Sequence, residues 1–265
     1  MNTQLLQGDC LELMKDIPDG SIDMILCDLP YGTTKCSWDV LIPFEPLWEQ
    51  YNRVIKDNGA IVLFGRQPFT STLVMSNTKM WRYELVWEKE KGTDFGNANR
   101  KFVNSHENIE VFYKKQPTYN KQLRKGKPYI KKNNRNNSKE DLNFGSDNSG
   151  TWINEGNRTP TTVLKITRDN IHKGKSLHPT QKPIALLEYL IKTYTNEGET
   201  VLDNCMGSGS TGIACIHTNR NFIGIELDEN YFKIAKDRIE SELNNIPYVK
   251  NDVHTDIKNE KVILF

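Results

Sequence analysis

A glycine-rich turn late in the chain constrains its fold more than any other feature. Residues 207–212 read Gly-Ser-Gly-Ser-Thr-Gly, follow a predicted strand at 201–205 and begin a predicted helix. A second strand is predicted at 222–225 and ends at Glu226, 19 residues after Gly207. A strand, a glycine turn, a helix and another strand are typical of an α/β protein whose sheet is mostly parallel.

The same alternation of strand and helix signals runs along most of the chain. Apolar runs at 22–27 and 60–64 predict buried strands. Apolar residues spaced i, i+3, i+4, i+7 over 44–55 predict an amphipathic helix that ends at 57–59. Further signals predict strands at 4–7, 83–87 and 108–113, and helices at 68–75, 184–191 and 231–243. Apolar residues at 161–166 predict another segment that belongs to the core. We therefore expect an α/β fold with a largely parallel sheet.

Composition changes abruptly at Lys114. Between Lys114 and Lys139 there are ten Lys or Arg residues and no Asp or Glu, and the chain through 159 is rich in Asn, Lys and Gly. Such a stretch does not build a core, so we expect an inserted, partly flexible region at 115–159. The catalytic domain is then expected at 1–114 and 160–245, with a C-terminal tail at 246–265.

The remaining composition excludes several classes of protein. The 265 residues suffice for one core with an insertion, and no apolar run approaches the ~20 residues that span a bilayer. The five cysteines form no CxxC pair and the histidines show no metal-binding spacing, so we expect neither a disulfide framework nor a metal site. The start of the chain lacks a signal-peptide pattern, and we expect a cytoplasmic protein.

Asp203 narrows the choice of ligand for the glycine turn. The turn and Glu226 match a dinucleotide-binding pattern, so a nicotinamide cofactor is one alternative, and a turn without a ligand is another. Asp203 would face a pyrophosphate with like charge, because it lies just before the turn. It suits a cationic ligand that carries an ammonium and a sulfonium, such as S-adenosylmethionine.

A second motif follows the strand at 22–27. Residues 28–31 read Asp-Leu-Pro-Tyr and are followed by Gly32, so an acid, a rigid carbonyl and an aromatic ring lie where the strand ends. Ligands bind at this edge of an open α/β sheet. The motif is therefore either a pocket for a planar ring that bears an amine, or a plain turn with a half-buried tyrosine.

Together the motifs resemble the β-class amino-methyltransferases of DNA. The resemblance rests on residues 28–31, on 178–183 (His-Pro-Thr-Gln-Lys-Pro) and on 203–209, and it covers roughly 4–240. As in that family, the catalytic motif precedes the cofactor motif in a circularly permuted order, with a target-recognition region between them. The one departure is Leu29, where the family more often has proline. The resemblance implies a Rossmann-like methyltransferase core with a mostly parallel seven-stranded sheet, helices on both faces and a basic inserted target-recognition region.

The resemblance also implies S-adenosyl-L-methionine as cofactor and assigns residues to it. The implied cofactor-binding residues are Asp9 and the Cys10 backbone at the adenine ring, Glu226 at the ribose, Asp203, Gly207, Ser208 and Gly209 at the methionine end, Asp28, and Thr180, Lys182 and Pro183, which close the site. Plain structural alternatives exist for three of them. Asp9 and Thr180 could be helix caps, Lys182 could be a solvated surface charge, and either Thr180 or Gln181 is expected to cap the helix that has Pro183 in its first turn.

The implied catalytic residues are Asp28, Pro30 and Tyr31. The Asp28 carboxylate and the Pro30 carbonyl (with the Leu29 carbonyl as a fallback) would accept hydrogen bonds from an exocyclic amine, and Tyr31 would stack on the base. Such a base must first be flipped out of the duplex. In the family, Asp as first motif residue implies the N6 amine of adenine.

The basic insertion is then expected to contact double-stranded DNA. Its expected contact residues are Lys121, Arg124, Lys125, Lys127, Lys131, Lys132 and Arg135, with a merely solvated surface as the alternative. We expect a role in restriction–modification, no membrane and no metal, and leave homodimerisation open. The alternatives for function are N4-cytosine methylation, an RNA substrate, an NAD-dependent oxidoreductase, and an inactive nucleic-acid-binding module.

Overall fold

The computed structural model describes residues 1–32, 39–93, 95–132, 151–167 and 181–245. The chain divides into two compact units, a larger one from Met1–Asn120 and Thr162–Phe265 and a smaller one from Lys121–Thr161. The larger unit contains both the turn after residues 22–27 and the glycine turn. The tail predicted at 246–265 lies outside the described residues.

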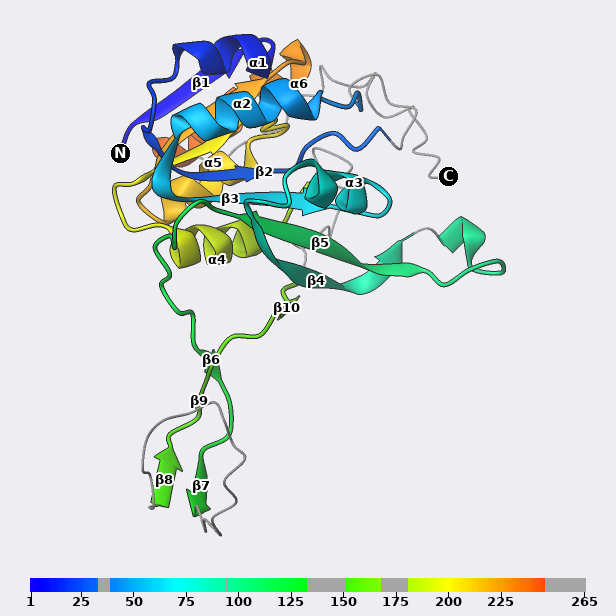
Figure 1. Ribbon diagram of the computed structural model, residues 1–265, viewed down its shortest axis with the longest axis vertical. Helices are drawn as coiled ribbons and strands as arrows, with labels where there is room; N and C mark the ends of the chain where they lie inside the picture. Colours follow the sequence, from blue (N-terminus) through cyan, green and yellow to red (C-terminus); the bar gives the residue numbers. More distant parts are fainter. Residues whose placement is uncertain (33–38, 94, 133–150, 168–180, 246–265) are drawn as a thin grey trace. The chain divides into compact units, whose positions relative to one another are not determined.

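Within the described residues, an eight-stranded sheet forms the centre of the larger unit (Figure 1). From edge to edge its strands are β1 (Thr3–Gln7), β12 (Asn221–Glu226), β11 (Thr200–Asp203), β2 (Ile22–Cys27), β3 (Ile55–Gly65), β5 (Asn104–Phe112), β4 (Trp81–Thr93) and β10 (Val163–Lys165). β5 runs antiparallel to both of its neighbours, and the other described pairings are parallel. The sheet is mostly parallel, as predicted, but has eight strands rather than seven because β10 pairs with β4 at one edge.

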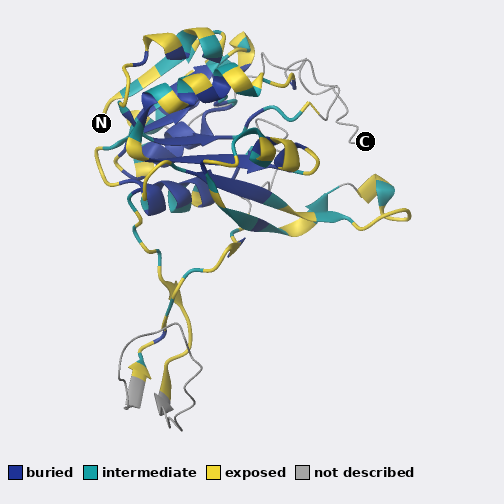
Figure 2. Cartoon of the chain, in the orientation of Figure 1, coloured by how far each residue is buried: buried dark blue, intermediate teal, exposed yellow. Residues whose placement is uncertain are grey.

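Helices cover both faces of the sheet, with a hydrophobic cluster under each set. α4 (Ile184–Tyr194), α5 (Ser210–His217) and α6 (Glu229–Leu243) pack on one face, and α1 (Cys10–Leu13), α2 (Phe44–Val54) and α3 (Phe69–Ser76) pack on the other. Met24 and Leu26 of β2 face the α4–α6 cluster. Ile25 and Cys27 face the α1–α3 cluster, so the strand is buried on both sides (Figure 2). No helix of the described residues is both long and apolar enough to cross a membrane.

The path of the chain across the sheet reverses between β2 and β11. From β2 the chain continues through α2 to β3 on one side, and from β11 it continues through α5 to β12 on the other side. The two strands are direct parallel neighbours, with Val201 beside Met24 and Leu202 beside Ile25. Ligands bind in open α/β sheets at the carboxyl ends of two such strands. This is the edge at which β2 and β11 end.

The glycine turn needs its glycines for two different reasons. Gly207 and Gly209 have φ values of 51° and 79°, in the left-handed region that favours glycine. Gly212 lies in α5, where an added Cβ would stand 2.5 Å from Cδ1 of Ile239 and 2.8 Å from Cε1 of Phe222. The third glycine therefore lets α5 pack closely against α6 and β12.

The smaller unit consists of two short antiparallel ladders. β6 (Arg124–Lys125) pairs with β9 (Asn157–Arg158), and β7 (Tyr129–Lys132) pairs with β8 (Thr151–Asn154). Inside this unit the Arg158 guanidinium lies 4.6 Å from the centre of the Tyr129 ring. None of the unit's described residues belongs to either hydrophobic cluster. The composition of this stretch indicated the lack of a core but gave no signal for its strands.

Three local expectations differ from the structure. α2 ends at Val54, and residues 57–59, expected to end it, lie inside β3. Pro183 is the N-cap of α4 rather than a first-turn residue, because its ψ of 133° is extended. The side chain of Gln181 does not cap this helix, and its Oε1 is buried without a hydrogen-bond partner among the described residues. The other expected cap, Thr180, lies outside the described residues.

We predict that Gly212→Ala lowers the free energy of unfolding by about 1–3 kcal/mol, because the new methyl group would overlap a buried ring. Urea unfolding of the purified protein measures this change. Gly96→Ala is the matched control, since nothing lies within 4 Å of a Cβ added there. Its effect should stay within about 0.5 kcal/mol. Equal stability of the two variants would contradict a packing role for Gly212.

Candidate active site

Asp28, Pro30 and Tyr31 lie together directly after β2. The Tyr31 hydroxyl donates a hydrogen bond to Oδ1 of Asp28 at 2.6 Å, and the Tyr31 ring stacks on Phe69 with ring centres 4.9 Å apart. Leu29 is 4% exposed and packs in the α1–α3 cluster. An aliphatic side chain therefore serves as the apolar anchor of this turn, and the departure from proline leaves the acid, the carbonyl and the ring in place.

The other carboxylate oxygen of Asp28 forms an ion pair with Lys182. Its ammonium contacts Oδ2 of Asp28, stands 3.2 Å from Oε2 of Glu107 and lies 4.9 Å from the centre of the Phe64 ring. Only 7% of Lys182 is exposed, so the alternative prediction of a solvated surface charge at this position is wrong. The residue enters the site from the segment that leads into α4.

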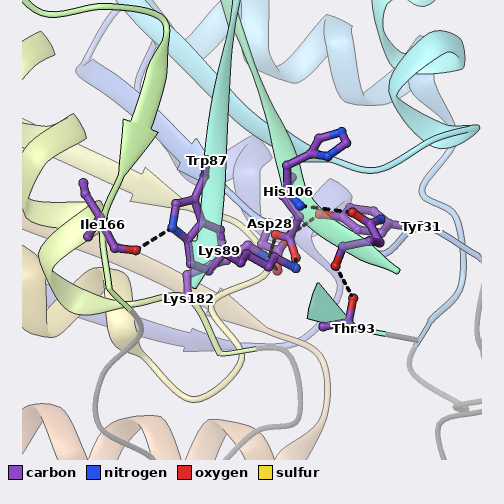
Figure 3. Close-up of polar contacts among 10 residues, drawn as sticks. Asp28, Tyr31, Trp87, Lys89, Thr93, His106, Ile166 and Lys182 are labelled. Carbon is purple, nitrogen blue, oxygen red and sulfur yellow. Dashed lines mark hydrogen bonds and ion pairs between the residues drawn. The ribbon is translucent and has the colours of Figure 1, made fainter. Parts of the chain in front are cut away.

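Glu107 and Lys89 extend this contact into a network that the sequence did not indicate. Figure 3 shows the Lys89 and Lys182 side chains close to Asp28. Nζ of Lys89 contacts Oε1 of Glu107 and lies 5.4 Å from the centre of the Trp87 ring. Trp87 is held in turn by a hydrogen bond of 2.9 Å from its Nε1 to the Ile166 carbonyl. Nothing in the sequence distinguished Lys89 and Glu107, because β4 and β5 contain several other charged residues, among them Glu84, Glu88 and Glu110.

In this network, burial and the neighbouring opposite charges shift the pKa of each group in opposite directions. Burial raises the pKa of Asp28, and the ammonium of Lys182 offsets part of that rise. Burial would lower the pKa of Lys182, but the carboxylates of Asp28 and Glu107 raise it above its ordinary value. Burial also acts to raise the pKa of Glu107, but Lys182 and Lys89 together lower it to about 2. Glu107 is therefore an ionised carboxylate between two ammonium groups at neutral pH.

Asp203 ends β11 and is 3% exposed. Its Oδ1 accepts a hydrogen bond from the Cys205 N–H at 3.1 Å, and its Oδ2 accepts one from the Thr211 hydroxyl at 2.6 Å. Burial raises the pKa of Asp203 to about 6, against those two hydrogen bonds. The carboxylate thus fixes the start of the glycine turn and keeps its negative charge at neutral pH.

Glu226 lies at the end of β12, beside the glycine turn. Its Oε2 accepts a hydrogen bond from the Gly207 N–H at 2.8 Å, and its Oε1 accepts one from the Asp228 N–H at 2.9 Å. Burial raises the pKa of Glu226, although these two backbone donors act in the other direction. Each of its oxygens has a second lone pair that can accept from a ligand hydroxyl.

Asp9 and Cys10 follow β1, the neighbour of β12. The Gly8 N–H donates to the Glu226 carbonyl at 2.9 Å, which joins the ends of the two strands. Asp9 is the N-cap of α1, where its carboxylate accepts from the Leu11 N–H at 2.8 Å, as the helix-cap alternative predicted. Four acids therefore follow one another along this sheet edge: Asp9 just after β1, Glu226 at the end of β12, Asp203 at the end of β11 and Asp28 just after β2.

Other residues assigned from the sequence have different surroundings. The carbonyl and hydroxyl of Ser208 accept hydrogen bonds from Arg238 of α6, so this side chain is engaged inside the protein. Pro183 is buried at the start of α4, and Cys10 is buried under the sheet edge. The described residues contain no group of three or more His, Cys, Asp or Glu that could hold a metal ion.

The residues predicted to contact DNA lie in the smaller unit. Lys121, Arg124, Lys125 and Lys127 are exposed there. Lys131 and Lys132 belong to β7, but their side chains are not described, and Arg135 lies outside the described residues. In the larger unit, Arg100 and Lys101 are exposed between β4 and β5.

Comparison with known proteins gives consistent matches. The sequence model of the N6/N4 methyltransferase family, described as DNA methylase, matches residues 22–237. The type II methyltransferase M.HpaI of Haemophilus parainfluenzae is 29% identical over 258 residues, which cover 92% of this chain and 76% of that protein. The crystal structure of the M1.HpyAVI–SAM complex is 27% identical with a TM-score of 0.62, and the match covers 89% of this chain and 99% of that chain.

The PvuII DNA methyltransferase (cytosine-N4-specific) has a TM-score of 0.66 over 92% of both chains, but at 16% identity it shows the fold alone. These structural matches confirm the expected Rossmann-like methyltransferase core. The family match spans most of the chain and includes both the turn after β2 and the glycine turn. This chain therefore belongs to the N6/N4 DNA methylase family.

Proposed function

We propose that this protein transfers a methyl group from S-adenosylmethionine to the N6 amine of adenine in double-stranded DNA. The observation that carries the proposal is the position of Asp28, Pro30 and Tyr31 just after the carboxyl end of β2, whose direct parallel neighbour β11 ends at Asp203. A pocket for an amine and a site for a cationic methyl donor are thereby neighbours at one sheet edge.

The donor set along this edge fits S-adenosylmethionine. Asp9, Glu226 and Asp203 lie at or just after the ends of three adjacent strands, and each is an acceptor suited to hydroxyl or ammonium groups. A pyrophosphate would require cations or open N–H groups here, whereas the Gly207 N–H already donates to Glu226. The bound donor supplies an electrophilic methyl group on a sulfonium, and M1.HpyAVI, a related protein, was solved in complex with SAM.

The turn after β2 can orient an exocyclic amine for attack. Such an amine is a poor nucleophile, because its lone pair is delocalised into the ring. Hydrogen bonds from its two N–H groups to the Asp28 carboxylate and the Pro30 carbonyl would direct the lone pair out of the ring plane. Tyr31, whose ring is already fixed against Phe69, would stack on the base and hold that angle. The Asp28 carboxylate would also stabilise the positive charge that develops on the amine.

Adenine is the proposed target because Asp is the first residue of the motif, although the same two acceptors could hold the N4 amine of cytosine. The target base must leave the helical stack to reach a turn at a sheet edge. The exposed cations Arg124, Lys125 and Lys127 of the smaller unit are proposed to hold the phosphates of the duplex. Homodimerisation stays a prediction.

We predict that Asp28→Asn lowers kcat for methyl transfer by about 10²–10³-fold, as expected when one charged partner of the developing cation is lost. Transfer of labelled methyl groups from S-adenosylmethionine to duplex DNA measures kcat, and calorimetry measures donor binding, which should persist. Asp19→Asn is the control, because the Asp19 side chain is 78% exposed and pairs only with Arg53 among the described residues. An Asp28→Asn variant as active as the control would refute the role of the turn.

The methylated product is predicted to contain N6-methyladenine. Genomic DNA from an expression host that lacks adenine methylation can be digested to nucleosides and analysed by mass spectrometry. Recovery of N4-methylcytosine alone would show that cytosine, not adenine, is the target base. Modification of RNA but not DNA would contradict a DNA substrate.

A triple variant with Ala at Arg124, Lys125 and Lys127 is predicted to bind DNA more weakly and with a flatter salt dependence. The slope of log affinity against log salt should fall by about 1 for each cation that contacts a phosphate. The control replaces Lys15, Lys192 and Lys236, which pair with glutamates on the larger unit and carry the same total charge. Identical slopes for the two triple variants would argue against phosphate contact by the smaller unit.

A further inference from the structure

Four charged side chains alternate in sign beside the turn after β2. Three of them, Lys89, Lys182 and Asp28, are labelled in Figure 3. Lys89 contacts Glu107, Glu107 stands 3.2 Å from Lys182, and Lys182 contacts Asp28. The Lys89 and Lys182 side chains are each 7% exposed, Glu107 is 14% exposed and Asp28 is 25% exposed. Two ammonium groups and two carboxylates thus share a mostly buried space with no net charge.

All four side chains lie on the face of the sheet that α4 covers. Asp28 continues the alternation of Met24 and Leu26, which face the α4–α6 cluster. Glu107 is two residues before Ile109, and Lys89 is two residues after Trp87, and both of these apolar residues belong to the same cluster. Asp28, Glu107 and Lys89 therefore stand where the strand alternation would otherwise place an apolar residue on this face of the sheet.

The negative charge of Glu107 affects the strength of the ion pair between Lys182 and Asp28. A buried ammonium needs carboxylate partners, because desolvation of an uncompensated charge is unfavourable. Lys182 has two such partners, and the Glu107 oxygen shares the attraction that would otherwise act on Asp28 alone. If Glu107 were neutral, Lys182 and Asp28 would form a closed pair. An incoming amine would then have to compete with Lys182 for the Asp28 carboxylate.

We propose that Glu107 is a positioning residue for methyl transfer: it shares Lys182 with Asp28, so that the Asp28 carboxylate stays able to accept the target amine. Lys89 fixes Glu107 through the other carboxylate oxygen. This inference rests on the proposed function for its effect on the rate. Its electrostatic part concerns Asp28 itself and can be measured without any methyl transfer.

The charges around Asp28 set the direction of the expected pH effect. Three groups lie against Asp28 directly: Lys182 from the segment before α4, Glu107 from β5 and Tyr31 from the same turn. Cys27 of β2 and Asp203 of β11 also interact with its charge, and Lys89 contacts the far oxygen of Glu107. Burial raises the pKa of Asp28, Lys182 lowers it, and the negative charge of Glu107 raises it. Removal of that negative charge should therefore lower the pKa of Asp28. Removal of the positive charge of Lys89 should raise it.

The test compares Glu107→Gln with the wild-type protein. We expect kcat to fall by about 10- to 100-fold, as for a displaced reacting group, with little change in donor affinity. The acid limb of the kcat/KM profile should move to lower pH. Glu107→Asp, which keeps the charge, should return the acid limb toward its wild-type position. Wild-type kcat together with an unmoved acid limb in Glu107→Gln would overturn the proposal.

Glu110→Gln is the matched control. Glu110 lies on the same strand, three residues away and therefore on the opposite face, is 1% exposed, and accepts a hydrogen bond of 2.6 Å from Nε1 of Trp81. The same isosteric change there should leave kcat and the pH profile as in the wild type. An equal loss of kcat in Glu110→Gln would show that neutralising any buried glutamate of β5 disturbs the enzyme, and would overturn a specific role for Glu107.

Two further measurements keep the inference separate from folding and from the proposed function. Lys89→Met should move the acid limb to higher pH, opposite to Glu107→Gln, a pair of signs that general destabilisation would not produce. NMR titration of carbon-13-labelled aspartate, with the Asp28 signal assigned by Asp28→Asn, reports the pKa of Asp28 directly. An Asp28 pKa that does not fall in Glu107→Gln would overturn the inference even in a protein that methylates no DNA.

Discussion

The parallel pairing of β2 with β11 is the constraint on which the rest of the larger unit depends. It is the point where the chain path reverses, and it brings two acidic strand ends together from positions far apart in the sequence. Asp23, the one charge within the apolar run of β2, secures this pairing. Its carboxylate accepts hydrogen bonds from the Thr200 N–H at 2.9 Å and from Lys56 at 2.6 Å, so it joins β2 to both neighbouring strands. A slip of two residues would displace Asp28 from Asp203 by roughly 6–7 Å.

The glycine turn shows how far its sequence pattern determines a ligand. Its spacing predicted the strand, the turn and the helix, because positive φ and close helix packing both require glycine. The same spacing fits a dinucleotide as well as S-adenosylmethionine. The choice between them comes from the acids Asp203 and Glu226, which the glycine pattern does not contain. Fold and ligand are therefore specified by different residues of one short segment.

The elements and the two motifs were predictable because their signals are local. Near-continuous apolar runs identified β2 and β3, and the residues after a strand indicated the binding edge. The ion-pair network was not predictable, because Lys89, Glu107 and Lys182 come from three separate segments and meet only when β4 and β5 pair and the lead into α4 crosses them. In the sequence each is one charge among many. The burial of Lys182, which changes it from a surface charge into a partner of Asp28, is likewise a property of tertiary packing.

The cations of the basic stretch that begins at Lys114 have different roles in the structure. Lys114 and Lys115 belong to the larger unit, where they bind the Asn52 carbonyl at 2.9 Å and the Asp57 carboxylate at 2.7 Å. Arg158 holds its own unit together by contacting the Tyr129 ring, the Asn154 side chain and the Lys127 carbonyl. A unit without a hydrophobic cluster must draw stability from such polar and ring contacts, so part of its positive charge is structural. Arg124 likewise donates a hydrogen bond of 3.3 Å to the Thr159 carbonyl. The exposed Lys121, Lys125 and Lys127 are therefore better suited to the proposed phosphate contacts.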